Sequence, residues 1–158
     1  MVLMCGVAGS GKTTYAQDLE RQGYARLSID EEVWRRFGRY GIDYPAEEYA
    51  ALSLTTEEAL RVRLLELIDA GRRVVVDLSF WQRAGRDEYK QLIEAAGGRW
   101  RLVYLKVPPD VLRSRLARRA ERFDANAAFP ITDDLLADFL AGFEEPHGEG
   151  EETIQAQH

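Results

Sequence analysis

The sequence predicts an α/β fold in which helices cover both faces of a parallel β-sheet, giving a three-layer α/β/α sandwich. Short apolar runs alternate with amphipathic segments along the chain, and a glycine-rich stretch joins the first run to the first amphipathic segment. The run RVVVDLSF at residues 73–80 is rich in β-branched residues, as expected of a strand buried on both faces. Strands alternating with helices at this spacing indicate βαβ units, and 158 residues suit a single domain over 1–158.

The first half of the chain divides into two strands and three helices. Apolar residues 1–5 predict the first strand, KTTYAQDLER the first helix, and residues 24–29 the second strand. Asp30 stands where the N-cap of the next helix is expected. A long helix is predicted over residues 46–70, and a break near residues 53–56 is an open alternative because TTEE resembles a capping box.

The second half repeats the alternation. A strand over 73–80, a helix over 84–96 and a strand over 99–107 are followed by Pro108-Pro109, which opens another helix. An N-capped helix is predicted over 132–143. The acidic tail, residues 144–158, contains ETIQA as a candidate edge strand, and the pattern leaves open whether the tail completes the sheet. Glu149, Glu151 and Glu152 are expected to form a solvated acidic end, with folding back near the nucleotide as the alternative.

Charge and cysteine content limit the function classes. The net charge of −6 has the wrong sign for a general nucleic-acid coat protein. The single cysteine cannot form an internal disulfide, no apolar run is long enough to span a bilayer, and the N-terminus lacks the pattern of a signal peptide. We therefore expect a cytoplasmic protein without a membrane partner.

Positive charge gathers in residues 113–122, which we call the arginine segment. It has five arginines and one acidic residue, so it carries +4 and the rest of the chain −10. Such a concentration suits a polyanion, although an exposed helix with solvated arginines would give the same pattern.

A phosphate-binding motif occupies residues 6–13. Gly6-Val7-Ala8-Gly9-Ser10-Gly11-Lys12-Thr13 fits G-x-x-x-x-G-K-[ST] at every fixed position, between a predicted strand and a predicted helix. Backbone N–H groups of such a loop and the helix N-terminus cradle phosphate oxygens. Lys12 is expected to reach the β- and γ-phosphates and Thr13 to place its hydroxyl on Mg²⁺. We therefore expect the chain to bind a nucleoside triphosphate.

Three classes of nucleotide-binding protein compete at this point. A switch GTPase usually needs an N-K-x-D element, which is absent. A motor ATPase usually has an acid pair after a hydrophobic strand, whereas Asp77 is followed by Leu78 and Ser79. Both differences favour a phosphotransferase.

The chain resembles the small P-loop kinases of the AAA-type ATP-binding, zeta-toxin and polynucleotide-kinase-like group, which share their layout with chloramphenicol phosphotransferase, gluconate kinase and shikimate kinase. The resemblance covers nearly the whole chain. It depends on GVAGSGKT, on SID followed by a basic helix, on VVVDLSFW with nearby arginines, and on RSRLARRAER. It implies ATP and Mg²⁺ as ligands and a short arginine-rich lid over residues 115–131.

Site residues follow from the resemblance position by position. Asp30 corresponds to the acid that orients or deprotonates the acceptor hydroxyl, and its place at the carboxyl end of a parallel strand independently suits ligand binding. Asp77 is expected near Mg²⁺ together with Thr13. The arginines Arg115 and Arg119 share one helical face and are expected to stabilise the transferring phosphoryl group with Lys12.

Two sets of binding residues complete the expectation. The residues expected to hold the nucleotide are Gly6, Ala8, Gly9, Ser10, Gly11, Lys12, Thr13, Thr14, Arg115 and Arg119. The residues expected to contact the acceptor are Asp30, Arg35, Trp81, Arg83 and Arg86.

The leading hypothesis is an ATP-dependent kinase that phosphorylates a hydroxyl of a small molecule, such as a metabolite or an antibiotic. A 5′-hydroxyl polynucleotide kinase and a non-kinase nucleotide-binding switch or clamp are the alternatives. The sequence does not identify the acceptor, the choice of ATP over GTP, or the oligomeric state.

Overall fold

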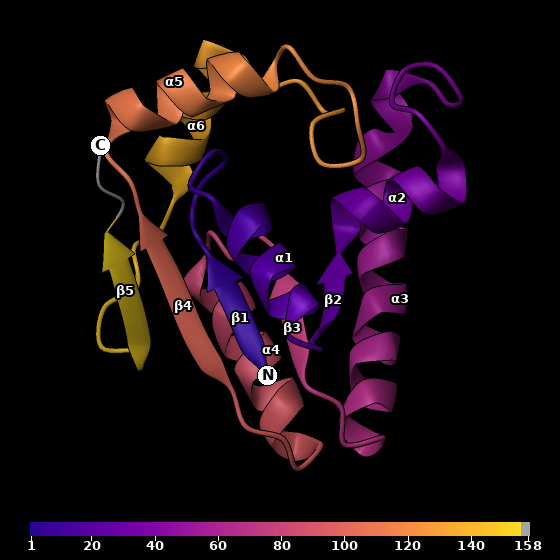
Figure 1. The fold of residues 1–158 in the computed structure, drawn as a ribbon, viewed down its shortest axis with the longest axis vertical. Helices are drawn as coiled ribbons and strands as arrows, with labels where there is room; N and C mark the ends of the chain where they lie inside the picture. The colour runs from indigo at the N-terminus through magenta and orange to yellow at the C-terminus, as the bar shows by residue number, and fades with distance from the viewer. Residues whose placement is uncertain (156–158) are drawn as a thin grey trace.

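A five-stranded sheet in the order β2-β3-β1-β4-β5, parallel throughout, forms the centre of the protein in a computed structural model that describes residues 1–155. Figure 1 shows the sheet with helices in front of and behind it. The strands are β1 (Val2–Cys5), β2 (Ala25–Ser28), β3 (Val74–Asp77), β4 (Arg101–Lys106) and β5 (Glu151–Gln155). The predicted α/β fold with a parallel sheet is confirmed.

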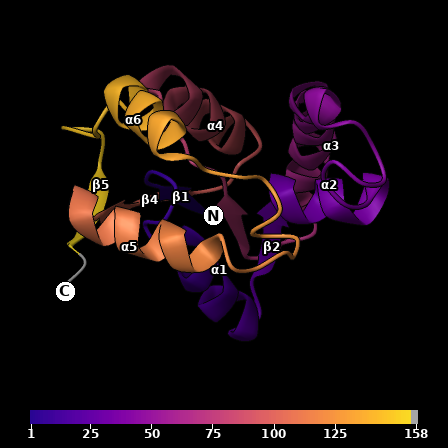
Figure 2. The same ribbon diagram turned by 90° about the horizontal axis from the view of Figure 1, so that it is seen from above.

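Six α-helices and one short 3₁₀ helix connect these strands within residues 1–155. They are α1 (Lys12–Arg21), α2 (Ile29–Phe37), the 3₁₀ helix Ala46–Glu48, α3 (Tyr49–Asp69), α4 (Arg83–Ala95), α5 (Pro109–Arg119) and α6 (Asp133–Gly142). Seen from above, α5 and α6 cross the end of the sheet to which the strands point (Figure 2).

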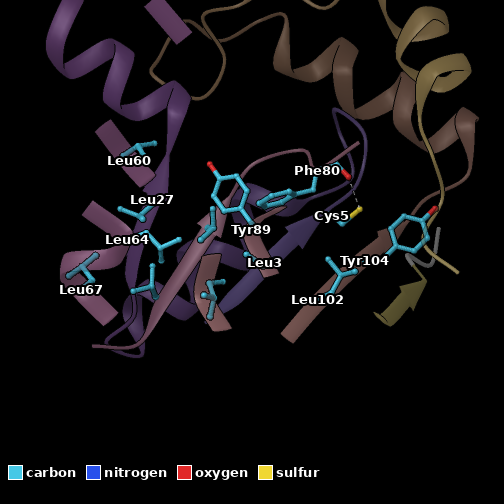
Figure 3. Close-up of a cluster of buried hydrophobic side chains, with 13 residues drawn as sticks. Leu3, Cys5, Leu27, Leu60, Leu64, Leu67, Phe80, Tyr89, Leu102 and Tyr104 are labelled. Atoms are coloured by element: carbon cyan, nitrogen blue, oxygen red, sulfur yellow. Dashed lines mark hydrogen bonds between the residues drawn. The ribbon is translucent and has the colours of Figure 1, made fainter. Parts of the chain in front are cut away.

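Two hydrophobic clusters hold the layers together. One face of the sheet packs against α3 and α4 through residues such as Leu64, Ile93 and Leu102, all fully buried. Figure 3 shows this cluster around β1 and β3. The opposite face packs against α1 through Ala16 and Leu19. Because both faces are covered, β1 and β3 are buried along their whole length.

The order of strands along the chain reverses at β1, which lies between β3 and β4. In open parallel sheets, ligands bind beyond the carboxyl ends of the strands at such a switch point. The glycine-rich loop follows β1 directly, so the phosphate-binding motif stands at the position where this fold binds ligands.

Two local expectations need correction. The α3 helix runs without a break over Tyr49–Asp69, so TTEE is not a capping box. Ser28, rather than Asp30, is the N-cap of α2: its hydroxyl accepts a hydrogen bond from the Glu31 amide at 3.3 Å. Asp30 is thereby placed in the first turn, with its carboxylate released from capping.

The tail from residue 144 to 155 returns to the sheet. The ETIQ part of the expected edge strand forms β5, which pairs in parallel with β4, while residues 156–158 lie outside the described part of the chain. Glu149 is buried just before it. A solvated acidic tail was therefore the wrong expectation for Glu149. No helix among residues 1–155 has the length and apolar character to cross a bilayer.

Candidate active site

The glycine-rich loop has the shape of a phosphate cradle. Gly11, the N-cap of α1, has φ 98°, a conformation that side-chain-bearing residues rarely adopt. A Cβ on Gly6 would lie 2.5 Å from the Ser10 hydroxyl oxygen, so the turn cannot accept a larger residue there without moving. Residues 9–13 of this loop line a cavity at the start of α1, where the helix N-terminus favours phosphate.

Lys12 folds back across this loop. Its ammonium group donates a hydrogen bond to the Val7 carbonyl at 3.1 Å. Burial lowers the pKa of Lys12, and the charges of Asp77 and Asp30 oppose that shift. Lys12 is the only cation of the loop, and an incoming phosphate would stabilise the ammonium charge that burial has stripped of water.

Two cavities meet at this lysine. The first, of about 620 Å³, is lined by residues 9–15 and by Arg115, Arg119 and Arg122. The second, of about 470 Å³, lies on the side of Asp30, Tyr49 and Trp81. The residues that line both cavities are Gly9, Lys12, Thr13, Arg119 and Asn126. We call the first the nucleotide cavity and the second the acceptor cavity, after the ligands expected for each.

Asp30 is the carboxylate at the junction, the place where the two cavities meet beside Lys12. It lines the acceptor cavity and accepts a hydrogen bond from the Tyr49 hydroxyl at 2.7 Å. Burial raises the pKa of Asp30, although the Tyr49 hydrogen bond and the positive charge of Arg119 lower it in part. A carboxylate with a raised pKa and one oriented partner has the properties of a general base.

Arg115 and Arg119 of the arginine segment line the nucleotide cavity. Arg115 donates hydrogen bonds to the carbonyls of Gly9 and Ser10, at 3.3 and 3.1 Å. Arg119 donates to the Asn126 carbonyl at 3.1 Å, and burial lowers its pKa. The predicted shared face of Arg115 and Arg119 thus points at the nucleotide cavity, whereas Arg118 is exposed and lies outside it.

Asp77 ends β3 beside the same junction. Arg26 of β2 donates two hydrogen bonds to one of its carboxylate oxygens, at 2.7 and 3.1 Å, and a third to Asn126 at 3.0 Å. The second Asp77 oxygen has no partner within residues 1–155. That oxygen and the Thr13 hydroxyl are hard oxygen donors on the walls of the acceptor cavity, so their chemistry fits Mg²⁺.

Comparison with known proteins identifies the family of this chain. The family model described as an AAA domain matches residues 1–146, almost the whole chain. The chain belongs to the AAA domain family. No curated protein sequence matches it.

Solved structures share the fold of this AAA domain at low sequence identity. A gluconokinase from Sinorhizobium meliloti is 24% identical with a TM-score of 0.64, covering 99% of this chain and 83% of its own. The APS kinase CysC of Mycobacterium tuberculosis, in complex with AMPPNP and APS, is 16% identical with a TM-score of 0.60 and coverages of 99% and 88%. Kti12 of Chaetomium thermophilum, in complex with ADP-AlF3, is 16% identical with a TM-score of 0.66 and coverages of 98% and 88%. The fold is that of kinase-like P-loop NTPases.

Three arginines expected at the acceptor lie outside the acceptor cavity. Arg35 is exposed and paired with Glu32, and exposed Arg83 is 3.6 Å from Asp87. Arg86 is fully buried, and its guanidinium donates two hydrogen bonds to the Glu149 carboxylate, both at 2.9 Å. The expectation that Arg86 contacts the acceptor is therefore wrong, since its guanidinium is paired with Glu149 of the tail. Trp81 does line the acceptor cavity.

The AAA domain holds functional candidates that the sequence did not reveal. Arg26 and Asn126 bridge Asp77 to the loop after α5, and Tyr49 orients Asp30. From the four-residue spacing alone, the sequence predicts that Tyr49, Ser53 and Glu57 share one face of α3. No motif in the sequence marks that face as functional. Phe80 has a left-handed φ of 48°, and its carbonyl accepts from Arg86 at 2.8 Å.

Proposed function

We propose that this AAA domain is an ATP-dependent phosphotransferase that moves the γ-phosphoryl group to a hydroxyl of a small molecule. The observation that carries the proposal is the junction: Asp30 faces the acceptor cavity next to Lys12 and Arg119, which line both cavities. A nucleotide-binding clamp without an acceptor has no need for a half-buried, oriented carboxylate beside a second cavity.

Each residue at the junction has a separate task in this proposal. Asp30, oriented by the Tyr49 hydroxyl, accepts the proton of the acceptor hydroxyl. Lys12 and Arg119 stabilise negative charge between the two cavities, and Arg115 holds the shape of the loop. When bound, ATP with Mg²⁺ supplies the phosphoryl group, and Thr13 and Asp77 are the residues that would hold the metal.

The decisive experiment follows label from γ-labelled ATP with Mg²⁺ into a pool of hydroxylated metabolites and antibiotics, with a 5′-hydroxyl oligonucleotide in a parallel sample. Asp30→Asn tests the base, and Asp69→Asn, at the far end of α3, is the matched control. We expect transfer to a small acceptor by the wild type and the control, and a loss of at least about 10²-fold in the Asp30 variant.

Two results would contradict the proposal. Label that appears only as free phosphate, at the same rate in wild type and the Asp30 variant, would favour a switch or clamp ATPase. Label on the oligonucleotide alone would assign the chain to polynucleotide kinases.

A further inference from the structure

The acceptor cavity has aromatic walls drawn from separate parts of the chain. Phe80 and Trp81 follow β3, Tyr89 belongs to α4, and Phe129 and Phe139 come from the loop and helix after α5. Phe129 stacks on Tyr49 with ring centroids 4.6 Å apart, and Phe80 meets Tyr89 edge to face at 4.9 Å. Flat rings pack well against such walls by stacking or edge contacts.

Polar groups enter the cavity mainly along one stripe of α3. Tyr49, Ser53, Glu57 and Arg61 are spaced four residues apart, so they share one helical face, and all four line the cavity. Eight residues separate Tyr49 from Glu57, which is about 12 Å along the helix axis. The cavity therefore runs from the proposed base at Asp30 to a polar end at Glu57 and Arg61.

The cations of this cavity are already engaged. Arg61 lies 2.6 Å from Glu88 and 3.7 Å from Glu57, with its guanidinium over the Tyr89 ring. Lys12 and Arg119 also line the nucleotide cavity, where phosphate oxygens are expected. An acceptor carrying a carboxylate, sulfate or phosphate would meet Asp30 and Glu57 without a free cation to pair with.

The polar end suits an uncharged group. Glu57 accepts a hydrogen bond from the Tyr89 hydroxyl at 3.0 Å, and the Ser53 hydroxyl is buried without a hydrogen-bond partner in residues 1–155. A buried hydroxyl without a partner costs free energy unless a ligand satisfies it. An amide or hydroxyl of a ligand could bond to Ser53 and Glu57 together.

Resting on the proposed function, we infer that the acceptor is an uncharged alcohol with a flat, aromatic body and a second polar group opposite its reacting hydroxyl. The hydroxyl lies at Asp30, the ring system against the stacked Tyr49–Phe129 pair and Trp81, and the second polar group at Ser53 and Glu57. The inference excludes sugar acids and nucleotides as acceptors because they are charged. It excludes open-chain polyols because they have no ring to pack against the aromatic walls of the cavity.

A matched set of ligands tests this inference without requiring turnover. Isothermal titration calorimetry on the full chain with ADP and Mg²⁺ compares 6-(hydroxymethyl)naphthalene-2-carboxamide with the corresponding naphthalene carboxylate, with sorbitol and with a 5′-hydroxyl dinucleotide. We expect the amide to bind at least about tenfold more tightly than each of the others. Phe129→Ala should weaken amide binding about tenfold, since it removes one wall.

Phe123→Ala is the control, because Phe123 belongs to the same loop, is half exposed and packs on Trp34 outside the cavity. Equal or tighter binding of the carboxylate, sorbitol or the dinucleotide would overturn the inference, as would no binding of any compound or an equal loss in both variants. Binding of the amide without any label transfer in the kinase assay would refute the proposed function and leave the ligand class standing.

Discussion

The buried ion pair between Arg86 and Glu149 gives the sharpest test of how the tail supports the site. The side chains of Arg86 and Glu149 are 0% and 1% exposed, and Lys90 also donates to the Glu149 carbonyl at 3.0 Å. Glu149→Gln keeps the shape of the side chain but leaves the Arg86 charge buried without its counter-ion. Breaking such a pair from one side costs about 3–5 kcal/mol of unfolding free energy.

The assay is urea unfolding followed by circular dichroism, with a thermal scan beside it. At about 2–4 °C per kcal/mol for a chain of this size, the thermal midpoint should fall by roughly 6–20 °C. Glu152→Gln is the matched control, because Glu152 forms a bidentate pair with Arg101 in which both side chains are about half exposed. Exposed pairs of this kind contribute about 0–1 kcal/mol.

The pH dependence gives an independent check on the same pair. Burial alone would raise the pKa of the Glu149 carboxyl, but the hydrogen bonds and charge of Arg86 outweigh it and hold the pKa below its ordinary value of 4.5. The pair therefore stabilises the fold above pH 4.5, and this contribution is lost as the pH falls through the lower folded-state value. Wild type and Glu149→Gln should converge in acid, and equal losses in Glu149→Gln and Glu152→Gln at neutral pH would refute the reasoning.

Three further predictions concern the junction and α6. Because burial raises the pKa of Asp30, its ionised carboxylate lowers the stability of the fold above pH 3.8. Asp30→Asn should therefore be at least as stable as the wild type at pH 7, and in thermal scans its added stability should disappear below pH 3.8. For the same reason, kcat/KM of the wild type plotted against pH should fall in acid with a midpoint above pH 3.8, and the residual activity of Asp30→Asn should lack this fall. If Asp30→Asn retains the fall, another residue is the base. Thr132→Ala removes the hydroxyl that caps α6 by accepting a hydrogen bond from the Leu135 amide at 3.2 Å. Urea unfolding should show a loss of about 1 kcal/mol of unfolding free energy. The control Thr55→Ala, at an exposed position, should change the unfolding free energy by less than about 0.5 kcal/mol.

The layered fold was predictable because its signals are local. An apolar run that ends at Gly6 and a β-branched run at residues 73–80 each specify a buried strand without help from distant residues. The phosphate loop was predictable for the same reason, since its glycines and Lys12 lie within eight consecutive residues. At the start of α2 the sequence pattern predicted Asp30 as the cap, whereas the cap in the structure is Ser28.

Contacts between distant residues could not be predicted in this way. Arg86 and Glu149 are 63 residues apart in the sequence. The sequence around each predicts an exposed side chain, and the two meet only because the tail before β5 lies beside α4 in the folded chain. Arg26 reaches Asn126 across 100 residues. A charged residue gives no sequence signal of its partner, so burial of these groups follows only from the assembled sheet.

The errors at Arg86 and Glu149 have one physical origin, and it connects the tail to the acceptor cavity. Phe80 lines that cavity in a left-handed conformation that costs free energy for a side-chain-bearing residue. Its carbonyl accepts hydrogen bonds from Arg86 and from the Cys5 thiol, at 2.8 and 3.4 Å, and Figure 3 shows the second of these. Since Glu149 fixes Arg86, the turn into β5 holds the strained residue that shapes one cavity wall. The last strand is thus a support for the proposed acceptor site as well as the edge of the sheet.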